Sequence, residues 1–456
     1  MRPSNLTLGE RDAERVVHGY TNLQQHRQDG ARVIVRGKGV YVFDDAGKEY
    51  IEAAAGMWCT SLGFGEEALV EAATVQMRKL PYYHTLASKS VAPSIELAER
   101  LAKYVPIANA KFYFANSGSE ANDFLIKFLW MYNNAIGRPA KKKVLARING
   151  FHGATIAATS LTGIKKNHKL FDLPLDRFLH VSDMHYYRDA WPGESEQAFS
   201  TRLAEELETT ILREGPETVM AFMAEPVTGG GGAVIPPKTY YEKIQAVLKK
   251  YDVMFLADEV INGFGRTGHF FGCDAFDIAP GAMTMAKGLT SAYQPMSAIA
   301  LNEEIYRGLE KGSDQVGSLA HGATYAGNPV GAAVALKVLD LMEERDIVGH
   351  VRRMAPHFKA RLERLRAHPL VGEVRSIGLM GAVEFAADKA TKRNFAPEGS
   401  FAAKVRARAE DMGVITRGAP VGDVIAFSPP LIITEREIGE VFDRFGAALD
   451  AVTAEL

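Results

Sequence analysis

The chain has 456 residues, with 53 lysines and arginines against 55 aspartates and glutamates, so its formal net charge is −2. This balance argues against nucleic acid or an anionic membrane surface as a partner. With 47% hydrophobic and 24% charged residues, the composition is that of an ordinary globular protein, and the length favours two lobes over one.

Targeting, membrane-spanning and metal-binding segments are not apparent in the sequence. Residues 1–17 carry charges throughout, and no later stretch approaches the roughly 20 apolar residues that span a bilayer. A cytoplasmic protein is therefore expected. Two cysteines, Cys59 and Cys273, are too few for a disulfide framework or a metal cluster. His152, His321 and the other histidines show no ligand spacing, so no metal site is expected.

The first two thirds of the chain predict a hairpin followed by a large sheet. Residues 32–52 read as a β-hairpin, because two β-rich arms flank the turn residues 44–47. From about residue 110 to 300, β-rich runs alternate with amphipathic or glycine-opened stretches, which is an α/β pattern. The strands should form one largely parallel sheet, with the hairpin in a different layer. The runs are KFYFAN, KVLARI, RFLHV, VMAFMAEP, VMFLADEV, AMTMAK and SAIALN.

After Asn328-Pro329 the pattern changes. A long helix from Val330 to about Glu344 should lead into a second helix, two short strands (VGEVRS and GAVEFA) and a closing helix near residues 434–449. We expect a large domain over residues 61–329 and a small α+β domain over residues 330–456, joined by the N-terminal segment, residues 1–60. The sequence has no Gly/Ser-rich linker between them, so the domains should pack tightly.

Ser117-Gly118-Ser119-Glu120 follows KFYFAN, the first expected strand of the large sheet, and begins a helix. In open α/β sheets, ligands bind at the carboxyl ends of strands, and the free N–H groups of a helix N-terminus suit an anion. A phosphate would fit there. The alternative is that Ser117 and Glu120 form a capping box, which needs no ligand.

Two further charged residues end apolar strands. A buried carboxylate at Asp258 needs a cation or several donors, and a protonated pyridinium nitrogen is one such cation. A helix cap or a salt bridge to Arg266 is the alternative. Burial of Lys287 would lower the pKa of its amine, as a Schiff-base lysine requires, whereas a side chain that reaches solvent is the alternative. An anion cradle, a strand-end carboxylate and a strand-end lysine together match the needs of pyridoxal phosphate.

Two glycine-rich runs imitate nucleotide-binding loops. Residues 263–268 satisfy G-x-G-x-x-G after a strand, but the following HFFGCDAFD has no helical period, so nicotinamide binding is not expected. Residues 229–232 are not followed by Gly-Lys-Ser/Thr and predict a close-packed loop rather than a phosphate loop.

Several segments, in order along nearly the whole chain, resemble the class III aminotransferases, which are pyridoxal-phosphate enzymes of fold type I. The resemblance implies an α/β fold, with a large domain built on a mainly parallel sheet and a smaller α+β domain. The matching segments are Gly56–Cys59, Asn116–Asn122, Asn149–Gly153, Ala224–Val227, Ala257–Gly268, Ala286–Thr290 and His321–Pro329.

The resemblance also implies roles for individual residues. Lys287 would bind the cofactor covalently and shuttle a proton, while Asp258 would pair with the pyridinium nitrogen. The family builds its site at a subunit interface, which implies a homodimer or a dimer of dimers. The other implied cofactor-binding residues are Ser117, Gly118, Ser119, Phe151, His152, Glu225, Val260 and, from the neighbouring subunit, Thr324.

Within the family, Trp58, Arg417 and the long N-terminal segment are most similar to ω-aminotransferases that pass an amino group from an amine or ω-amino acid to pyruvate by ping-pong chemistry. Arg417 matches the arginine that binds the carboxylate of pyruvate or alanine, with a surface salt bridge as the alternative. The implied substrate-binding residues are Tyr20, Trp58, Phe151, Gly230, Arg417 and, from the partner, Leu86.

Some points stay open. Phe151, Leu86 and Gly230 stand where many relatives have a tyrosine, an aromatic residue and an alanine, so pocket size and substrate choice are not fixed. Residues 418–422 look longer than usual, which leaves the resting position of Arg417 open. The donor is not identified: β-alanine, a diamine, taurine or an arylalkylamine would each fit.

Other activities are also compatible with these residues. An acceptor such as 2-oxoglutarate would need a second cation, and none is identified in the sequence. A racemase, mutase or decarboxylase of the same fold is an alternative, and a non-catalytic binding protein is another.

Overall fold

The computed structural model describes residues 6–456, so residues 1–5 of the expected N-terminal segment lie outside the described residues. All the predicted β-rich runs become strands of one seven-stranded sheet, ordered β4-β10-β9-β8-β7-β5-β6. Strands β6, β5, β7, β8 and β9 run parallel, while β10 is antiparallel to both β9 and β4. The largely parallel sheet is confirmed. The bounds are β4 (Lys111–Ala115), β5 (Lys143–Arg147), β6 (Phe178–Val181), β7 (Val219–Ala224), β8 (Met254–Asp258), β9 (Ala282–Met285) and β10 (Ser297–Leu301).

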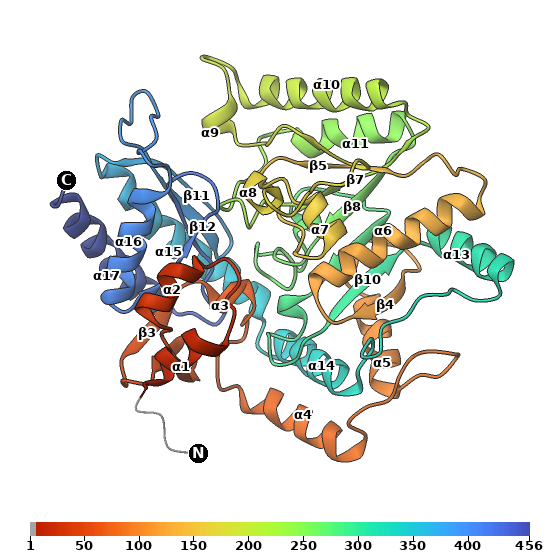
Figure 1. Cartoon of the computed structure of the whole chain (residues 1–456), viewed down its shortest axis with the longest axis horizontal. Helices are drawn as coiled ribbons and strands as arrows, with labels where there is room; N and C mark the ends of the chain where they lie inside the picture. Colours follow the sequence, from red (N-terminus) through yellow and green to blue (C-terminus); the bar gives the residue numbers. More distant parts are fainter. Residues whose placement is uncertain (1–5) are drawn as a thin grey trace.

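Helices cover both faces of this sheet (Figure 1), and its inner strand β7 is accordingly apolar and buried at every residue. Phe222 of β7 packs in one hydrophobic cluster with residues of α10 and α11, whereas Met220 and Met223 pack in another with residues of α6 and α13. The bounds are α6 (Gly118–Ala135), α7 (Ile156–Leu161), α8 (Lys165–His168), α9 (Tyr186–Asp189), α10 (Glu196–Glu214), α11 (Tyr240–Lys250), α12 (Gly272–Ala275), η1 (Lys287–Leu289) and α13 (Glu303–Val316).

The N-terminal segment forms its own small sheet. The expected hairpin is present as β2 and β3, and β1 adds a third strand by pairing with β2. Strand β3 also pairs in parallel with β13, with Ile51 opposite Val414, so the N-terminal segment joins the C-terminal part of the chain, as Figure 1 also shows. The bounds are α1 (Leu8–Arg15), α2 (Leu23–Asp29), β1 (Ile34–Lys38), β2 (Tyr41–Asp44), β3 (Glu49–Glu52), α3 (Ala55–Trp58) and β13 (Val414–Ile415).

The C-terminal elements follow the predicted order and form a third sheet, β11-β12-β15-β14. Helix α14, however, packs against α4 and α5 of the expected large domain. On this packing we propose that the boundary between the two expected domains lies nearer Glu344 than residue 330. The bounds are α4 (Glu67–Lys79), α5 (Ala92–Leu101), α14 (Pro329–Glu344), α15 (Ile347–Arg364), η2 (Leu365–Ala367), β11 (Val371–Ile377), β12 (Met380–Phe385), α16 (Ser400–Asp411), β14 (Arg417–Gly418), β15 (Val424–Phe427) and α17 (Glu435–Thr453).

Neither glycine-rich run has the geometry of a nucleotide-binding loop. Residues 263–268 form turns, and the helix that follows, α12, has four residues and begins only at Gly272. In the run 229–232, a Cβ added at any position would come within 3 Å of a neighbouring atom, so this loop is close-packed, as predicted. Over residues 6–456, no helix is both long and apolar enough to cross a membrane.

Candidate active site

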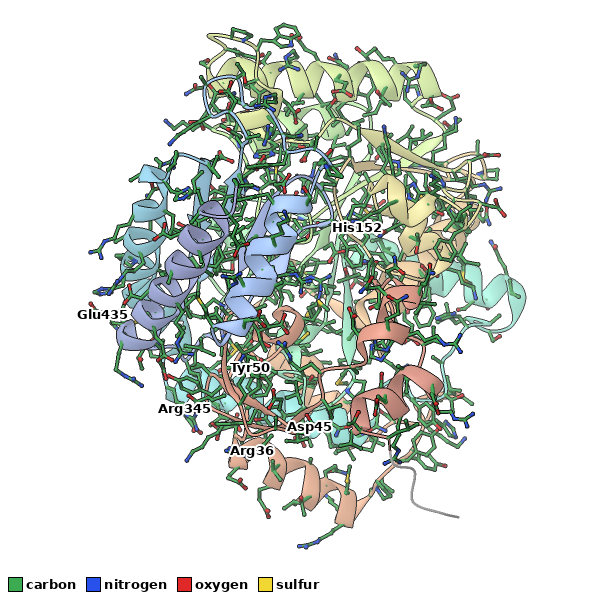
Figure 2. The ribbon with its side chains drawn as sticks, turned by 60° about the vertical axis from the view of Figure 1, so that its left-hand side comes forward. Arg36, Asp45, Tyr50, His152, Arg345 and Glu435 are labelled. Atoms are coloured by element: carbon green, nitrogen blue, oxygen red, sulfur yellow. The ribbon has the colours of Figure 1, made fainter. Side chains whose placement is uncertain are left out.

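The strands of the large sheet bring the predicted polar residues together at one edge. Asp258 is the last residue of β8, and Lys287 follows β9 by two residues. Phe151 and His152 lie beyond β5, and Glu225 directly follows β7. The carboxyl ends of these parallel strands meet at the same edge, where ligands of open α/β sheets bind. Figure 2 shows His152 near the middle of the molecule.

A cavity of about 350 Å³ lies at this edge. Its lining includes the strand-end residues, the start of α6 and the loop after η1, so one chamber contains every predicted cofactor-binding residue except Thr324. Those residues are Ser117, Gly118, Ser119, Phe151, His152, Glu225, Asp258, Val260 and Lys287.

The start of α6 forms the anion-binding end of this chamber. Ser117 is the N-cap, and its Oγ accepts a hydrogen bond from Glu120 N at 3.2 Å. The Glu120 carboxylate does not accept from the backbone N–H of Ser117, as a capping box requires. It accepts instead from Asn116 N and Nδ2 at 2.8 and 3.0 Å, so only half of the predicted capping box forms. A Cβ at Gly118 would lie 2.9 Å from both Val260 methyl groups, so only glycine lets the helix start approach this closely. The first N–H groups of α6 remain available to an anion.

Asp258 is held by N–H donors rather than by an arginine. Its Oδ2 lies 2.8 Å from His152 Nδ1 and accepts from Asn122 Nδ2 at 2.9 Å, while its Oδ1 accepts from Val260 N at 3.1 Å. Arg266 instead donates to the carbonyl oxygens of Leu379 and Pro429, so a salt bridge between Arg266 and Asp258 is excluded. With two donors on Oδ2 and one on Oδ1, the free lone pair of Oδ1 is the position for a ring nitrogen.

Glu225 is buried on the same side of the chamber. Its Oε1 accepts from Phe151 N at 3.0 Å and its Oε2 from Gly229 N at 2.8 Å. Burial raises the pKa of Glu225, although the nearby His152 opposes the shift. A carboxyl group that holds its proton can donate a hydrogen bond to an oxygen of a bound ring.

Lys287 stands where two cavities meet. Its backbone has φ of 45°, in the left-handed region that a non-glycine residue adopts only when its surroundings impose it. Burial lowers the pKa of its amine, while Cys59, Asp258 and Glu225 raise it. The lowered pKa favours the neutral amine, the form that acts as a nucleophile or base. Lys287 is half-buried and lines both cavities, so its side chain extends into the site and not, as in the predicted alternative, to the outer surface.

The second cavity, of about 360 Å³, shares Phe151, Ile261 and Lys287 with the first. Its walls include Tyr20, whose ring lies 6.3 Å from that of Phe151. Its other lining residues include Met57, Trp58, Ile164, Lys166, Gly230, Arg406, Arg417, Ala419 and Pro420. The chamber thus combines an aromatic wall with cationic side chains.

Arg417 projects into this second chamber from β14 and lies over Trp58, with 5.4 Å between Cζ and the ring centroid. Burial lowers the pKa of Arg417. Within residues 6–456, no carboxylate lies within ion-pair distance of its guanidinium, so the predicted alternative of a surface salt bridge does not hold. The loop after it, residues 419–422, closes the turn to β15, and its first two residues line the chamber.

Gly230 fixes the position of Phe151. A Cβ at Gly230 would lie 2.7 Å from Phe151 Cβ, so an alanine there would displace the aromatic ring. The absence of a side chain at residue 230 and the position of Phe151 are therefore coupled, and they set the width of the chamber together.

Two predicted residues lie outside both chambers. Thr324 is exposed in the loop before α14, and its carbonyl oxygen accepts from Tyr82 Oη at 2.8 Å. Leu86 packs on Gly322 of the same loop. The family resemblance implies that both residues act in the neighbouring subunit's site, and their separation from this chain's chambers is compatible with that role.

Sequence reasoning missed several residues that line the chambers or hold the residues that do. Asn122 lies within the matched segment 116–122, but its bond to Asp258 depends on the helix geometry. Cys59 lines the first chamber, and burial raises the pKa of its thiol. Lys166 and Arg406 line the second chamber with Arg417. No local sequence signal marks these two, because they come from distant parts of the chain.

The first chamber fits pyridoxal phosphate. It offers a glycine-lined helix start for the phosphate, an acceptor at Asp258 for the ring nitrogen, and the half-buried Lys287 for the aldehyde carbon. The side chains of Val260 and Phe151 are available to contact the ring. Each of these groups is placed by the fold before any ligand binds.

The comparisons with known proteins agree with this geometry. The family model described as Aminotransferase class-III matches residues 23–449. The chain is 47% identical over 420 residues, 92% of its length, to a probable γ-aminobutyrate transaminase 3, mitochondrial, from Oryza sativa subsp. indica, covering 82% of that protein. The crystal structure of the omega transaminase from Pseudomonas jessenii in complex with PMP has 48% identity and a TM-score of 0.97, over 98% of this chain and 99% of that one.

A structure described as a transaminase with L-Ala has 49% identity and a TM-score of 0.91, over 93% of this chain and 99% of that one. The matched family spans almost the whole chain, and the fold and the cofactor chamber agree with it. The protein belongs to the class III aminotransferases, pyridoxal-phosphate-dependent enzymes of fold type I.

Proposed function

We propose that this aminotransferase transfers an amino group from an amine or ω-amino acid to pyruvate, forming alanine, by a ping-pong mechanism. The observation that carries the proposal is the second chamber, where an aromatic wall and the guanidinium of Arg417, which pairs with no carboxylate of residues 6–456, line one cavity with Lys287. The wall suits the organic part of an amine donor, and the guanidinium suits the carboxylate of pyruvate. The solved relative described as bound to L-Ala supports alanine as the product.

The residues of the first chamber would position the cofactor. Ser117, Gly118 and Ser119 would hold its phosphate, and Asp258 would accept from its protonated ring nitrogen. When bound, pyridoxal phosphate supplies an electron sink that stabilises negative charge at the substrate carbon.

Lys287 would move the proton. Burial lowers the pKa of its amine, so a larger fraction is neutral and able to accept a proton from the substrate carbon. Glu225, whose pKa is raised, would donate to the phenolic oxygen of the ring. Both shifts have the sign that these roles require.

Arg417→Ala should separate the two half-reactions. A charge-assisted, bidentate contact is worth about 1.5–3 kcal/mol, so we expect kcat/KM for pyruvate and alanine to fall by roughly 10- to 150-fold. An amine donor without a carboxylate makes no such contact, and its half-reaction should change only a few-fold. Stopped-flow absorbance of the cofactor follows each half-reaction separately.

Arg417→Lys is the matched control for charge. A point charge lacks the planar fork of a guanidinium, so lysine should restore little of the pyruvate half-reaction. If both half-reactions fell equally in Arg417→Ala, the side chain would be structural, and the carboxylate would be recognised elsewhere.

A second acceptor class is favoured by a feature that the sequence did not reveal. Lys166 and Arg406 are largely exposed side chains that line the same chamber as Arg417, and partial desolvation together with the charge of Arg417 lowers the pKa of Lys166. A second cation is what the distal carboxylate of 2-oxoglutarate needs. The same cations would suit an ω-amino acid such as γ-aminobutyrate, which the relative from Oryza sativa is named for.

Lys166→Met tests this second candidate. If Lys166 binds a distal carboxylate, kcat/KM for 2-oxoglutarate should fall by about 10-fold or more while the value for pyruvate stays within a few-fold. Lys165→Met, which changes the exposed neighbour outside both chambers, is the matched control. Unchanged values for both acids in Lys166→Met would show that Lys166 binds no distal carboxylate, and a wild type that does not turn over 2-oxoglutarate would remove this acceptor.

The proposal also includes a homodimer or a dimer of dimers. Thr324 and Leu86 belong to a surface region with exposed Tyr82, Tyr83 and Tyr325, where a second copy could supply them to the active site. Sedimentation of the 49.8 kDa chain distinguishes monomer, dimer and tetramer. A monomer with full activity would exclude the shared site.

A further inference from the structure

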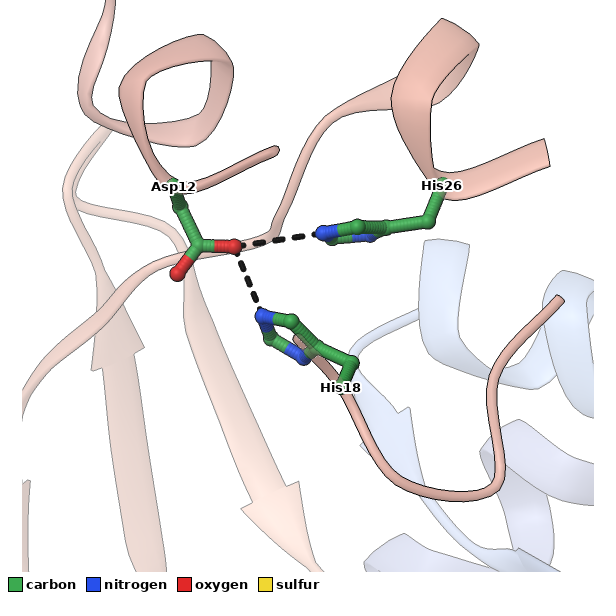
Figure 3. Close-up of side chains that lie close together, drawn as sticks. All are labelled: Asp12, His18 and His26. Carbon is green, nitrogen blue, oxygen red and sulfur yellow. Dashed lines mark hydrogen bonds and ion pairs between the residues drawn. The ribbon is translucent and has the colours of Figure 1, made fainter. Parts of the chain in front are cut away.

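A second group of reactive side chains lies in the N-terminal segment. Asp12 is on α1, His26 is on α2, and His18 is in the loop between these helices. His18 Nε2 lies 2.7 Å and His26 Nε2 3.2 Å from the same Asp12 Oδ2. Figure 3 shows both rings directing a nitrogen at this oxygen, and their centroids are 4.3 Å apart.

The three side chains have the chemistry and spacing of metal ligands. Each offers one ligand atom, and these atoms lie within 4.8 Å of one another. Two imidazoles and one carboxylate form a donor set that Zn²⁺ and other divalent transition metals prefer. The side chains of Asp12, His18 and His26 are 24%, 34% and 9% exposed, so an ion can enter and water can complete its coordination. Within residues 6–456, Asp12 pairs with no lysine or arginine that would occupy the place of a cation.

In a second cluster with similar spacing, arginines already pair with a carboxylate that would have to bind the ion. His185, Glu373 and Glu384 also lie close enough together to bind an ion. Arg375 Nη1, however, lies 2.7 Å from Glu384 Oε2, and Arg188 also pairs with Glu384. A metal ion there would have to displace a buried guanidinium from its carboxylate, which is strongly unfavourable.

We infer that Asp12, His18 and His26 bind one divalent transition-metal ion, such as Zn²⁺, with water in the remaining positions. No metal site is expected from the sequence alone, because the histidines do not follow the short, regular spacing of known metal-binding motifs. Here the histidines are eight residues apart, and it is the turn between α1 and α2 that brings them to one carboxylate.

The ion would fix the loop that borders the substrate chamber. Residues 16–22 join α1 to α2 and include the ligand His18. The same loop includes Tyr20, whose backbone has φ of 54°. Tyr20 lines the second chamber, and its hydroxyl accepts a hydrogen bond from Asn167 at 3.2 Å. An ion that joins both helices and the loop reduces the conformations open to this segment, so its binding should hold Tyr20 in place.

Metal titration of the cofactor-loaded enzyme tests the inference. Protein without a histidine tag is treated with a chelator, desalted and titrated with Zn²⁺, and with Co²⁺ as a spectroscopic probe. We expect one ion per chain and a visible Co²⁺ absorption that Zn²⁺ abolishes. His18→Ala and His26→Ala should each weaken Zn²⁺ binding by more than about 100-fold, because losing even a supporting contact of a ligand costs 10- to 100-fold.

His357→Ala is the matched control, since His357 lies on α15, is 42% exposed and sits 3.1 Å from Glu435. It should bind Zn²⁺ as the wild type does. Amide hydrogen exchange in residues 16–22 should slow on addition of Zn²⁺ in the wild type and in His357→Ala, but not in the His18→Ala/His26→Ala double variant. Absence of saturable binding to the wild type, or equal binding by the double variant, would show that the cluster is only a hydrogen-bonded group.

Discussion

Lys287→Ala should abolish turnover and leave a folded protein that still binds pyridoxal phosphate. We expect kcat to fall by at least about 10⁴-fold, the upper end of what a positioned general base contributes, because the same side chain would also carry the cofactor. The cofactor should stay bound, because the α6 N-terminus and Asp258 hold its phosphate and ring independently of the lysine. Absorbance of the bound cofactor and the melting temperature separate loss of chemistry from loss of folding.

A covalent label identifies the lysine directly. Borohydride reduction of the wild type should leave the cofactor permanently attached to Lys287, and peptide mass spectrometry locates it. Small primary amines should restore part of the activity of Lys287→Ala, because the vacated space opens into both chambers. A label on another lysine, or near-normal turnover by the variant, would make the assignment wrong.

The fold was predictable where the hydrophobic pattern is uninterrupted. Strands such as β7 are buried at every residue and read as continuous apolar runs, which is the signature of a parallel sheet covered on both faces. The hydrophobic pattern does not show which domain a helix packs against. Helix α14 follows Asn328-Pro329, a strong start signal, yet its apolar face is buried on α4 and α5, more than 200 residues earlier in the chain.

The active site was predictable only as far as strand ends reveal it. Asp258, Lys287 and the start of α6 each follow a strand whose direction the parallel sheet sets, so their convergence follows from topology. Lys166 and Arg406 lie on elements of different layers and meet at the second chamber only through tertiary packing. The contact between Gly230 and Phe151 likewise depends on two loops whose approach no local pattern encodes.

Asp258→Asn should fold correctly and lose most of its rate of proton abstraction. The variant lacks the negative charge that stabilises a protonated ring nitrogen, and loss of one well-placed electrostatic contact of about 3–4 kcal/mol slows a step roughly 10²–10³-fold. The substrate deuterium isotope effect on the donor half-reaction should rise, since proton transfer becomes more strongly rate-limiting. Turnover close to that of the wild type would remove Asp258 from the mechanism.

The hydrogen bonds of Asp258 explain why asparagine is a severe substitution here. The group at the Oδ2 position must accept from Asn122 Nδ2 and contact His152 Nδ1, so the amide oxygen of asparagine should occupy it. The amide NH₂ then takes the place of Oδ1, where it faces the N–H of Val260 and the ring nitrogen. An N–H donor at this place favours an unprotonated ring nitrogen, which is the opposite of what the carboxylate does. Asp258→Glu keeps the negative charge but moves it by one methylene. It should therefore retain more of the rate of proton abstraction than Asp258→Asn. Equal losses in the two variants would indicate that the position of the group, and not its charge, is decisive.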